Sequence, residues 1–204
     1  SASRLPEPFS ELAHIEEASD IDSALSKGHP YALIIMTGVD EALVRDIRRR
    51  VRISSIPILI VADSFSPDEV ESISDIPNVI IANTAILESA DFLSRIASIA
   101  GGSSILPPFT GIVVKKAIVY INSHVTRQIS RWRLASSVNI SEDYLTRIFR
   151  KELGLSPWDY INRYRIQIAS SLLVNTSRAL SDIAESCGFQ DQAYFCRVFK
   201  KVKG

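Results

Sequence analysis

The chain has 204 residues, of which 46% are hydrophobic, and its formal net charge is zero. This amount of apolar material supports hydrophobic cores and excludes a wholly disordered chain. The longest apolar runs, Tyr31 to Met36 and Ile56 to Ala62, are far shorter than the roughly 18 residues of a membrane span, and without a secretion-signal pattern we expect a cytoplasmic protein.

The net charge of zero is the sum of two opposed halves. Residues 1–108 carry 8 basic and 16 acidic side chains, a net charge of −8, whereas residues 109–204 carry 15 and 7, a net charge of +8. The segment Gly101 to Pro108 between them has the glycine, serine and proline content of a linker. We therefore expect an acidic domain over 1–100, a linker over 101–110 and a basic domain over 111–204. A basic domain suits a polyanion such as nucleic acid, and a solvated basic surface is the alternative.

In the first half, short apolar runs alternate with helix-like segments. The runs 33–35, 58–61 and 79–81 are nearly continuous, which is typical of strands buried on both faces. The segments 40–51, 66–74 and 88–100 have helical composition, and Ser66-Pro67-Asp68-Glu69 is a helix-start signal. This alternation predicts an α/β fold, a parallel sheet with helices on both of its faces.

After the linker the helical period takes over, which predicts an all-α domain. An apolar stripe through Ile112, Val113, Ala117, Tyr120 and Ile121 predicts an opening helix. Ser156-Pro157 begins a second helix that we expect to run to about Val174. The aromatic residues at core phase are predicted to fill this domain; they are Trp132, Trp158 and Phe189.

The basic half contains an internal repeat. Tyr144-Leu-Thr-Arg-Ile-Phe-Arg-Lys151 matches Tyr194-Phe-Cys-Arg-Val-Phe-Lys-Lys201 at an offset of 50. Each copy reads as a short helix, a turn and a second helix, with Ser141 as a cap in the first copy and Gly188 in a turn of the second.

Each of the two second helices has an apolar face and a short, polar or basic face. Arg147 and Arg197 lie at the same phase of the basic face. Such a face suits the major groove of DNA, which admits a helix; ordinary amphipathic hairpins with solvated arginines are the alternative. A joining helix of about 18 residues would span about 27 Å, close to the roughly 34 Å between successive major-groove faces.

From about Lys115 to Gly204 the chain resembles the DNA-binding domain of the AraC/XylS family of bacterial transcription regulators. The resemblance rests on motifs in matching order and spacing, which include Leu134-Ala135, Tyr144-Leu145, Ser156-Pro157, Gly188-Phe189 and Arg197 to Lys201. It implies two helix-turn-helix units bridged by a long helix. Family domains continue past the glycine that matches Gly204.

The resemblance also implies site residues, by position. Contacts to DNA bases would come from Glu142, Asp143, Thr146, Arg147, Gln192, Ala193 and Arg197. Contacts to phosphates would come from Ser141, Arg150, Lys151, Lys200 and Lys201. Asp143 and Ala193 are the weakest matches, because a carboxylate accepts only from the cytosine amino group and alanine offers only apolar contact. Double-stranded DNA is the expected partner, and a second copy bound through the first half and RNA polymerase are further candidates.

The acidic half resembles the receiver domain of two-component response regulators, through the order of its elements alone. In that alignment Leu12 to Glu16 is the second strand and Tyr31 to Met36 the third, while the opening strand and its helix find no match. We therefore expect this half not to fold as a complete receiver without rearrangement or another chain.

The residues that receiver chemistry needs are also missing from the aligned positions. The phosphoacceptor position falls near Met36, the hydroxyl position at Ala62 and the lysine position at Asn83, and methionine cannot accept a phosphoryl group. Capping accounts for the nearest carboxylates, Asp40 and Asp63. We predict a phosphorylation-independent pseudo-receiver that serves association or ligand response; a phosphorylation-controlled response regulator is the alternative. The charge cluster from Arg45 to Arg52 is interpreted as a solvated face.

We expect neither catalysis nor a cofactor or metal. The three histidines are isolated, and no Cys/His spacing is typical of a zinc site. AraC-like domains also occur fused to DNA alkyl-transfer enzymes, but those need an activated cysteine, and both cysteines, Cys187 and Cys196, lie in the helix-turn-helix units. A protein-interaction antagonist that keeps the fold without DNA binding is a further alternative.

Overall fold

The computed structural model describes residues 16–26, 31–50, 53, 55–102 and 109–204. In the first half, β1 (Ile34–Thr37), β2 (Ile58–Ala62) and β3 (Val79–Asn83) form a parallel sheet in the order β1-β2-β3. Ile58 of β2 pairs with Ile34 on one side and Val79 on the other. The first four residues of β2 are all buried, so both faces of the sheet are covered. The predicted α/β fold is confirmed.

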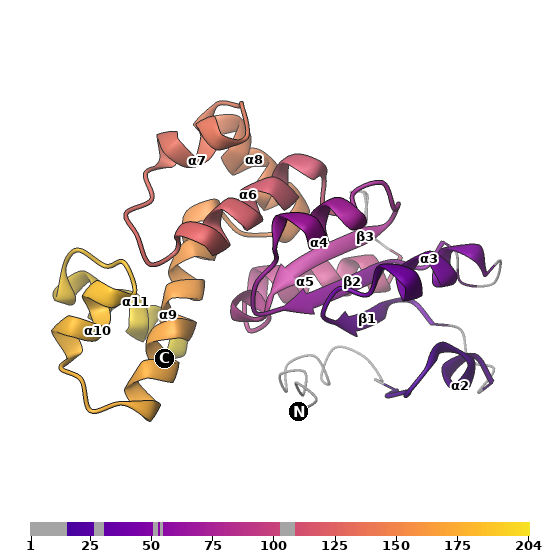
Figure 1. Ribbon diagram of the computed structural model, residues 1–204, viewed down its shortest axis with the longest axis horizontal. Helices are drawn as coiled ribbons and strands as arrows, with labels where there is room; N and C mark the ends of the chain where they lie inside the picture. The colour runs from indigo at the N-terminus through magenta and orange to yellow at the C-terminus, as the bar shows by residue number, and fades with distance from the viewer. Residues whose placement is uncertain (1–15, 27–30, 51–52, 54, 103–108) are drawn as a thin grey trace.

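The helices of this half are α2 (Ile21–Ser26), α3 (Glu41–Arg49), α4 (Pro67–Ser72) and α5 (Ala90–Ala100), with a 3-10 turn, η1 (Thr84–Ile86), before α5. Two of them, α3 and α4, begin at capping signals that the sequence contains. Asp40 caps α3, and Ser66 and Glu69 cap α4 reciprocally. In Figure 1, α5 passes behind the strands. Of the strand expected at Leu12 to Glu16, residues 12–15 lie outside the described part, as do residues 103–108 of the expected linker.

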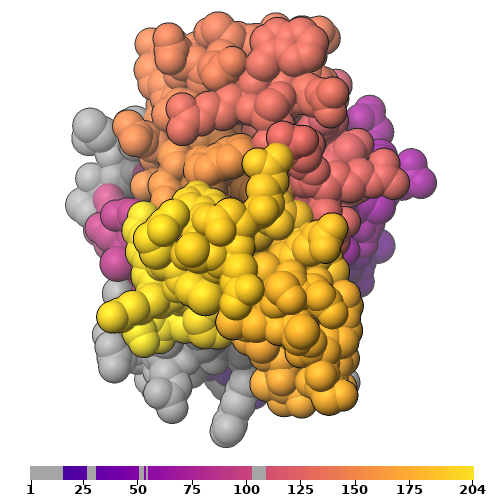
Figure 2. Space-filling model, turned by 90° about the vertical axis from the view of Figure 1, so that its left-hand side faces the viewer, coloured from indigo at the N-terminus to yellow at the C-terminus, as the bar shows by residue number. Residues whose placement is uncertain are grey.

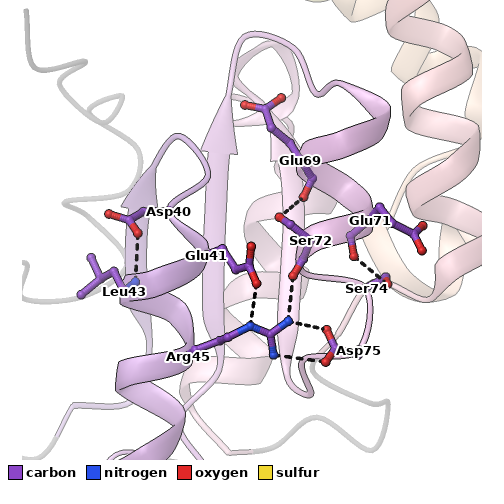
Figure 3. Close-up of polar contacts among 9 residues, drawn as sticks. All are labelled: Asp40, Glu41, Leu43, Arg45, Glu69, Glu71, Ser72, Ser74 and Asp75. Carbon is purple, nitrogen blue, oxygen red and sulfur yellow. Dashed lines mark hydrogen bonds and ion pairs between the residues drawn. The ribbon is translucent and has the colours of Figure 1, made fainter.

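Arg45 and Arg48 of α3 bind their surroundings, so the interpretation as a solvated face is wrong for these two arginines, whereas Arg49 is exposed. Arg45 donates to Glu41 over 2.7 Å, to both carboxylate oxygens of Asp75 over 3.1 Å and to the carbonyl of Ser72 (Figure 3). The same contact holds the pKa of Asp75 below its usual range. Arg48 donates to three backbone carbonyls, those of Ile56, Pro77 and Asn78. These bonds join α3 to the loops that flank β2 and β3. Arg52 lies outside the described residues.

The second half is all helical, as predicted. Its helices are α6 (Ile112–His124), α7 (Arg131–Ser137), α8 (Glu142–Leu153), α9 (Pro157–Asn175), α10 (Leu180–Ser186) and α11 (Gln192–Lys203). The pairs α7–α8 and α10–α11 are the two copies of the repeat, and α9 bridges them (Figure 1). No helix in the described ranges is long and apolar enough to cross a membrane.

The opening helix that the apolar stripe predicts is confirmed as α6, and Ala117 and Ile121 of that stripe are fully buried. Ile112 is 42% exposed, whereas Val114 and Ile118 are fully buried, on a helix that contacts α4, α7 and α8. One expectation about the core of this half is wrong. Trp132 is 66% exposed. The short helix α7 buries only Leu134 and Ala135, and this leaves the aromatic residue in its first turn at the surface.

The two halves share one hydrophobic core. A single cluster of buried side chains extends from Met36 of β1 to Tyr164 of α9, and a smaller one fills the second helix-turn-helix unit. The amide of Thr110 donates to Val79 over 3.0 Å, and its hydroxyl accepts from the amide of Ile81 over 3.1 Å, so the second half begins along β3. Buried Lys115 of α6 donates to the carbonyl of Ile73. The division into separate domains stays a prediction.

The bridging helix α9 covers the carboxyl edge of the sheet. Gln167 donates to Thr84 of η1 over 2.6 Å, and Thr84 donates to Asp63, which follows β2, over 2.6 Å. On the same helix Tyr160 is fully buried and Tyr164 nearly so. Burial raises the pKa of both phenols. The first half therefore contacts the helix that sets the spacing of the two helix-turn-helix units.

Candidate nucleic-acid interface

Helix α8 has the inner and outer faces that the sequence predicts. Ser141 caps its first turn by accepting from the amide of Tyr144 over 3.3 Å. Leu145, Ile148 and Phe149 are buried, and Phe149 is fully so. The side chain of Arg147 is exposed on the opposite face. The chain leaves the helix at Gly154, whose φ of +82° is the left-handed conformation that favours glycine.

Helix α11 repeats this arrangement. Asp191 caps it by accepting from the amides of Ala193 and Tyr194 over 3.0 and 2.8 Å. Phe195 and Val198 are buried, and Phe199 packs against them. The outer face is exposed and consists of Gln192, Ala193, Cys196, Arg197 and Lys200. The predicted inward stripes of both helices are confirmed.

The twelve predicted site residues lie on these two helices and on the cap of α8, in two groups. Eleven have exposed side chains, and these are Ser141, Glu142, Asp143, Arg147, Arg150, Lys151, Gln192, Ala193, Arg197, Lys200 and Lys201. Thr146 is half-buried, and its hydroxyl donates to the carbonyl of Glu142 over 2.9 Å. Lys201 forms an ion pair with Asp159 of α9 over 3.4 Å.

Two tyrosines beside the arginines of the outer faces are not among the predicted site residues. The guanidinium carbon of Arg147 lies 5.0 Å from the ring centre of Tyr144, and that of Arg197 lies 5.8 Å from the ring centre of Tyr194. Both contacts are within cation–π range. The signal was present in the sequence, because tyrosine precedes arginine by three residues in both copies of the repeat, which places the two side chains on one helical face.

The beginning of α9 lies between the two outer faces. Trp158 lines a groove beside α8, together with Glu142, Thr146 and Arg150, and a second groove beside α11. The residues of α11 on the second groove include Tyr194, Arg197 and Lys201. The guanidinium of Arg131 lies 5.9 Å from the Trp158 ring centre. At the offset of 50, the α11 residues on the second groove match Tyr144, Arg147 and Lys151 of α8, whereas α8 itself lines the first groove with Glu142, Thr146 and Arg150. The two helices therefore turn opposite edges of the repeated outer face toward Trp158.

Arg165 of α9 fixes the second unit relative to the first. It donates to the carbonyls of Val125 and Arg127, between α6 and α7, over 2.9 and 2.8 Å, and its guanidinium lies 5.6 Å from the Phe189 ring centre. Gly188 has a φ of +84°, and a Cβ there would lie 2.8 Å from the carbonyl oxygen of Val125. Burial lowers the pKa of Arg165. The turn of the second unit therefore packs tightly against the segment that leads into the first.

The acidic half touches the rim of this surface. Glu88 forms an ion pair with Lys203 at the end of α11 over 3.0 Å, and Ser89 and Asp91 line the groove between α9 and α11. Figure 2 shows this side of the molecule, where the surface facing the viewer belongs mostly to the second half and the first half appears at the rim.

The described residues contain no group of three His, Cys, Asp or Glu side chains that could hold a metal ion. Cys187 is buried and Cys196 exposed, and both thiols are free. Burial raises the pKa of the Cys187 thiol, which favours the unreactive protonated form.

Comparisons with known proteins concern the second half. A model described as a helix-turn-helix domain matches residues 134–204. The lactose operon transcription activator of Staphylococcus xylosus is 36% identical over 88 residues, which are 43% of this chain and 32% of that protein. The arabinose operon regulatory protein of Escherichia coli is 34% identical over 102 residues, which are 50% of this chain and 35% of that protein. The chain thus spans about a third of the length of these curated relatives.

Among solved structures, the C-terminal domain of AraT, a response regulator from Geobacillus stearothermophilus, is 32% identical with a TM-score of 0.44. The alignment covers 46% of this chain and 78% of that one. The relatives are transcription regulators and not enzymes. The helix-turn-helix domain predicted at the end of the chain is confirmed, and the receiver-like character of the first half stays a prediction.

Proposed function

We propose that this chain is a sequence-specific, DNA-binding transcription regulator of the AraC type that acts in the bacterial cytoplasm. The match of its second half to a helix-turn-helix domain and to the arabinose operon regulatory protein supports this proposal. One observation carries the proposal. Two copies of one unit present exposed basic faces with arginine at the same phase, and a rigid helix of 19 residues joins them. At 1.5 Å per residue that helix spans about 28 Å.

The proposal assigns base reading to the outer faces of α8 and α11. Arg147 and Arg197 can each donate two hydrogen bonds to a guanine, and Gln192 can pair with an adenine; each such bidentate contact contributes roughly 1 to 3 kcal/mol of discrimination. Glu142, Asp143, Thr146 and Ala193 complete the base-facing set. Ser141, Arg150, Lys151, Lys200 and Lys201 contact phosphates, which position the protein without reading sequence.

The two outer faces point to the same side in this proposal. The edges that α8 and α11 turn toward Trp158 are opposite flanks of the repeated face. Two units in the same orientation, joined through opposite flanks, present their outer faces in one direction. Such a pair reaches two successive major-groove faces of a duplex, about 34 Å apart.

We also propose that the first half works without phosphorylation. Its carboxylates near the carboxyl edge of the sheet have structural partners, since Asp40 accepts from the amide of Leu43 and Asp63 from the hydroxyl of Thr84. Met36 is buried at the aligned phosphoacceptor position. Incubation with a small phosphodonor and Mg²⁺, followed by intact-mass measurement, should leave the mass unchanged; an acid-labile adduct would favour the phosphorylation-controlled alternative. Self-association through this half and binding to RNA polymerase can be measured with the same full-length chain.

The test of base reading compares two duplexes at fixed salt. The first is selected by the full chain from genomic fragments, and the second has a random sequence. Arg197→Ala should weaken binding to the selected duplex far more than to the random one, and Arg147→Ala should do the same. Arg49→Ala is the matched control, because Arg49 is an exposed arginine of α3 in the first half. Equal losses on both duplexes would contradict base reading, and failure to select any duplex would favour the non-binding antagonist.

A further inference from the structure

Each arginine assigned to base reading lies against a tyrosine three residues earlier. The distances from guanidinium carbon to ring centre are 5.0 Å for Arg147 on Tyr144 and 5.8 Å for Arg197 on Tyr194. We propose that Tyr144 and Tyr194 are positioning residues that hold the two guanidinium groups in the orientation in which they read bases. This inference rests on the function proposed above and adds the residues that orient its reading groups.

The direction of the contact agrees with this role. Side chains on a helix lean toward its N-terminus, and the N-terminal residues of a recognition helix are those that meet the base edges. An arginine folded back onto the tyrosine three residues earlier is therefore directed toward the end of the helix that enters the groove. The alternative, an arginine extended toward the C-terminus, would direct the charge to Lys151 or Lys201 and away from the bases.

The contact also leaves donors of the guanidinium available. A guanidinium group carries five N–H donors in a planar fork, and a cation–π contact at 5.0 or 5.8 Å from the guanidinium carbon to the ring centre does not engage all of them. Two such donors bond the two major-groove acceptors of a guanine. The tyrosine thus restricts the arginine before DNA arrives, and a restricted side chain loses less conformational freedom on binding.

The second tyrosine is itself held by the bridging helix. Asn162 of α9, which is 9% exposed, donates from its side-chain amide to the Tyr194 hydroxyl over 3.2 Å. The ring of Tyr194 also lies 6.0 Å from that of Phe189, centre to centre. Tyr144 is 41% exposed. We therefore expect Tyr194 to restrict its arginine more strongly than Tyr144 does.

The experiment uses the full chain, a duplex that it selects from a random-sequence pool, and an unselected random duplex. Tyr194→Leu removes the ring and Tyr194→Phe keeps it, so the phenylalanine variant is the matched control. Tyr194→Leu should weaken binding to the selected duplex by about two- to fivefold, the factor expected for an exposed cation–π contact. Binding to the random duplex should not change in either variant. Tyr194→Phe should keep the affinity for the selected duplex, and its melting temperature should fall slightly, because the side-chain amide of Asn162 loses the hydroxyl to which it donates.

A double-mutant cycle separates positioning from packing. On an Arg197→Ala background, Tyr194→Leu should cause no further loss of affinity for the selected duplex, because the group that it positions is gone. A loss that persists on that background, or that is equal on both duplexes, would overturn the inference. The same set built on Tyr144 and Arg147 should show the same pattern with a smaller effect.

A measurement without DNA keeps this inference distinct from the proposed function. The Nε–H signal of Arg197 in NMR spectra should be shifted upfield by the ring in the unmodified chain and in Tyr194→Phe, and should lose that shift in Tyr194→Leu. An unchanged signal in Tyr194→Leu would overturn the inference even if Arg197 reads bases. If Arg197→Ala leaves affinity for the selected duplex unchanged, the proposed function fails, and the positioning role fails with it.

Discussion

Gln167 of the bridging helix donates a hydrogen bond of 2.6 Å to Thr84, which itself donates to Asp63 at the carboxyl edge of the sheet. These bonds join the acidic half to the helix between the two helix-turn-helix units. Because α9 also carries Arg165, which binds the segment before the first unit, any displacement of the first half reaches the helix that sets the spacing of α8 and α11.

The shared core predicts that the two halves unfold together. The full chain should show one unfolding transition, with equal stability reported by far-ultraviolet circular dichroism and by hydrogen exchange in β3 and α9. Gln167→Ala should lower that stability by about 1 kcal/mol, as expected for one intramolecular hydrogen bond. Gln128→Ala, at an exposed glutamine, is the control and should change nothing. Two separate transitions would show that the halves are independent.

Gly154 should tolerate no side chain. Its φ is +82°, and a Cβ would lie 2.5 Å from the backbone oxygen of Asp91 in α5. Gly154→Ala should therefore cost at least about 2 kcal/mol, from left-handed backbone strain and from separation of α5 and α8. Gly38 has a φ of +79° with open space around its Cβ position, so Gly38→Ala should show the strain alone. Equal free energies of unfolding for the two variants would contradict the close approach.

Glu152 should make stability depend on pH. Burial raises the pKa of this carboxyl and is the largest effect on it. The amide of Gly111, which donates to the carboxyl over 2.7 Å, and the charges of Lys151, Arg95 and Lys115 act in the opposite direction and lower the pKa. Between the usual pKa and the raised one, the folded chain binds more protons than the unfolded chain, so a rising pH destabilises the fold. Glu152→Gln keeps an acceptor for Gly111 and removes the titration.

The measurement is the free energy of unfolding of both proteins between pH about 4 and about 8. Relative to Glu152→Gln, the unmodified chain should lose stability as the pH rises through the window above the usual glutamate pKa. A gain of stability over that window would mean that the neighbouring cations outweigh the burial of the carboxylate.

Phosphate contacts should appear in the salt dependence of binding. Lys200 is exposed at the end of the outer face of α11. Lys200→Ala should weaken binding to selected and random duplexes by similar factors, and should reduce the slope of log K against log salt by about 0.9. A loss confined to the selected duplex would instead assign Lys200 to base reading.

Local patterns predicted much of the fold, since the strands are β-branched runs and the helices begin at Asp40, Ser66, Ser141 and Ser156, whose side chains cap them. The inward stripes of α8 and α11 followed from helical period alone. Contacts that depend on which surfaces meet could not be predicted in this way. The partners of Lys115 and Gln167 lie in the other half of the chain, and Ile112 is exposed because the buried face of α6, which includes Val114 and Ile118, is rotated from the predicted stripe.

The spacing of two contacted DNA segments reports on the relative placement of the two helix-turn-helix units. In the proposed complex α8 and α11 present their outer faces to one side and bind successive major-groove faces. Inserting five base pairs between the two segments of a selected duplex turns one of them by about half a helical turn. The affinity should then fall to that of a duplex with one segment scrambled. Only one of the two substitutions, Arg147→Ala or Arg197→Ala, should weaken binding to the duplex with the insertion any further. Unchanged affinity after the insertion would contradict this placement.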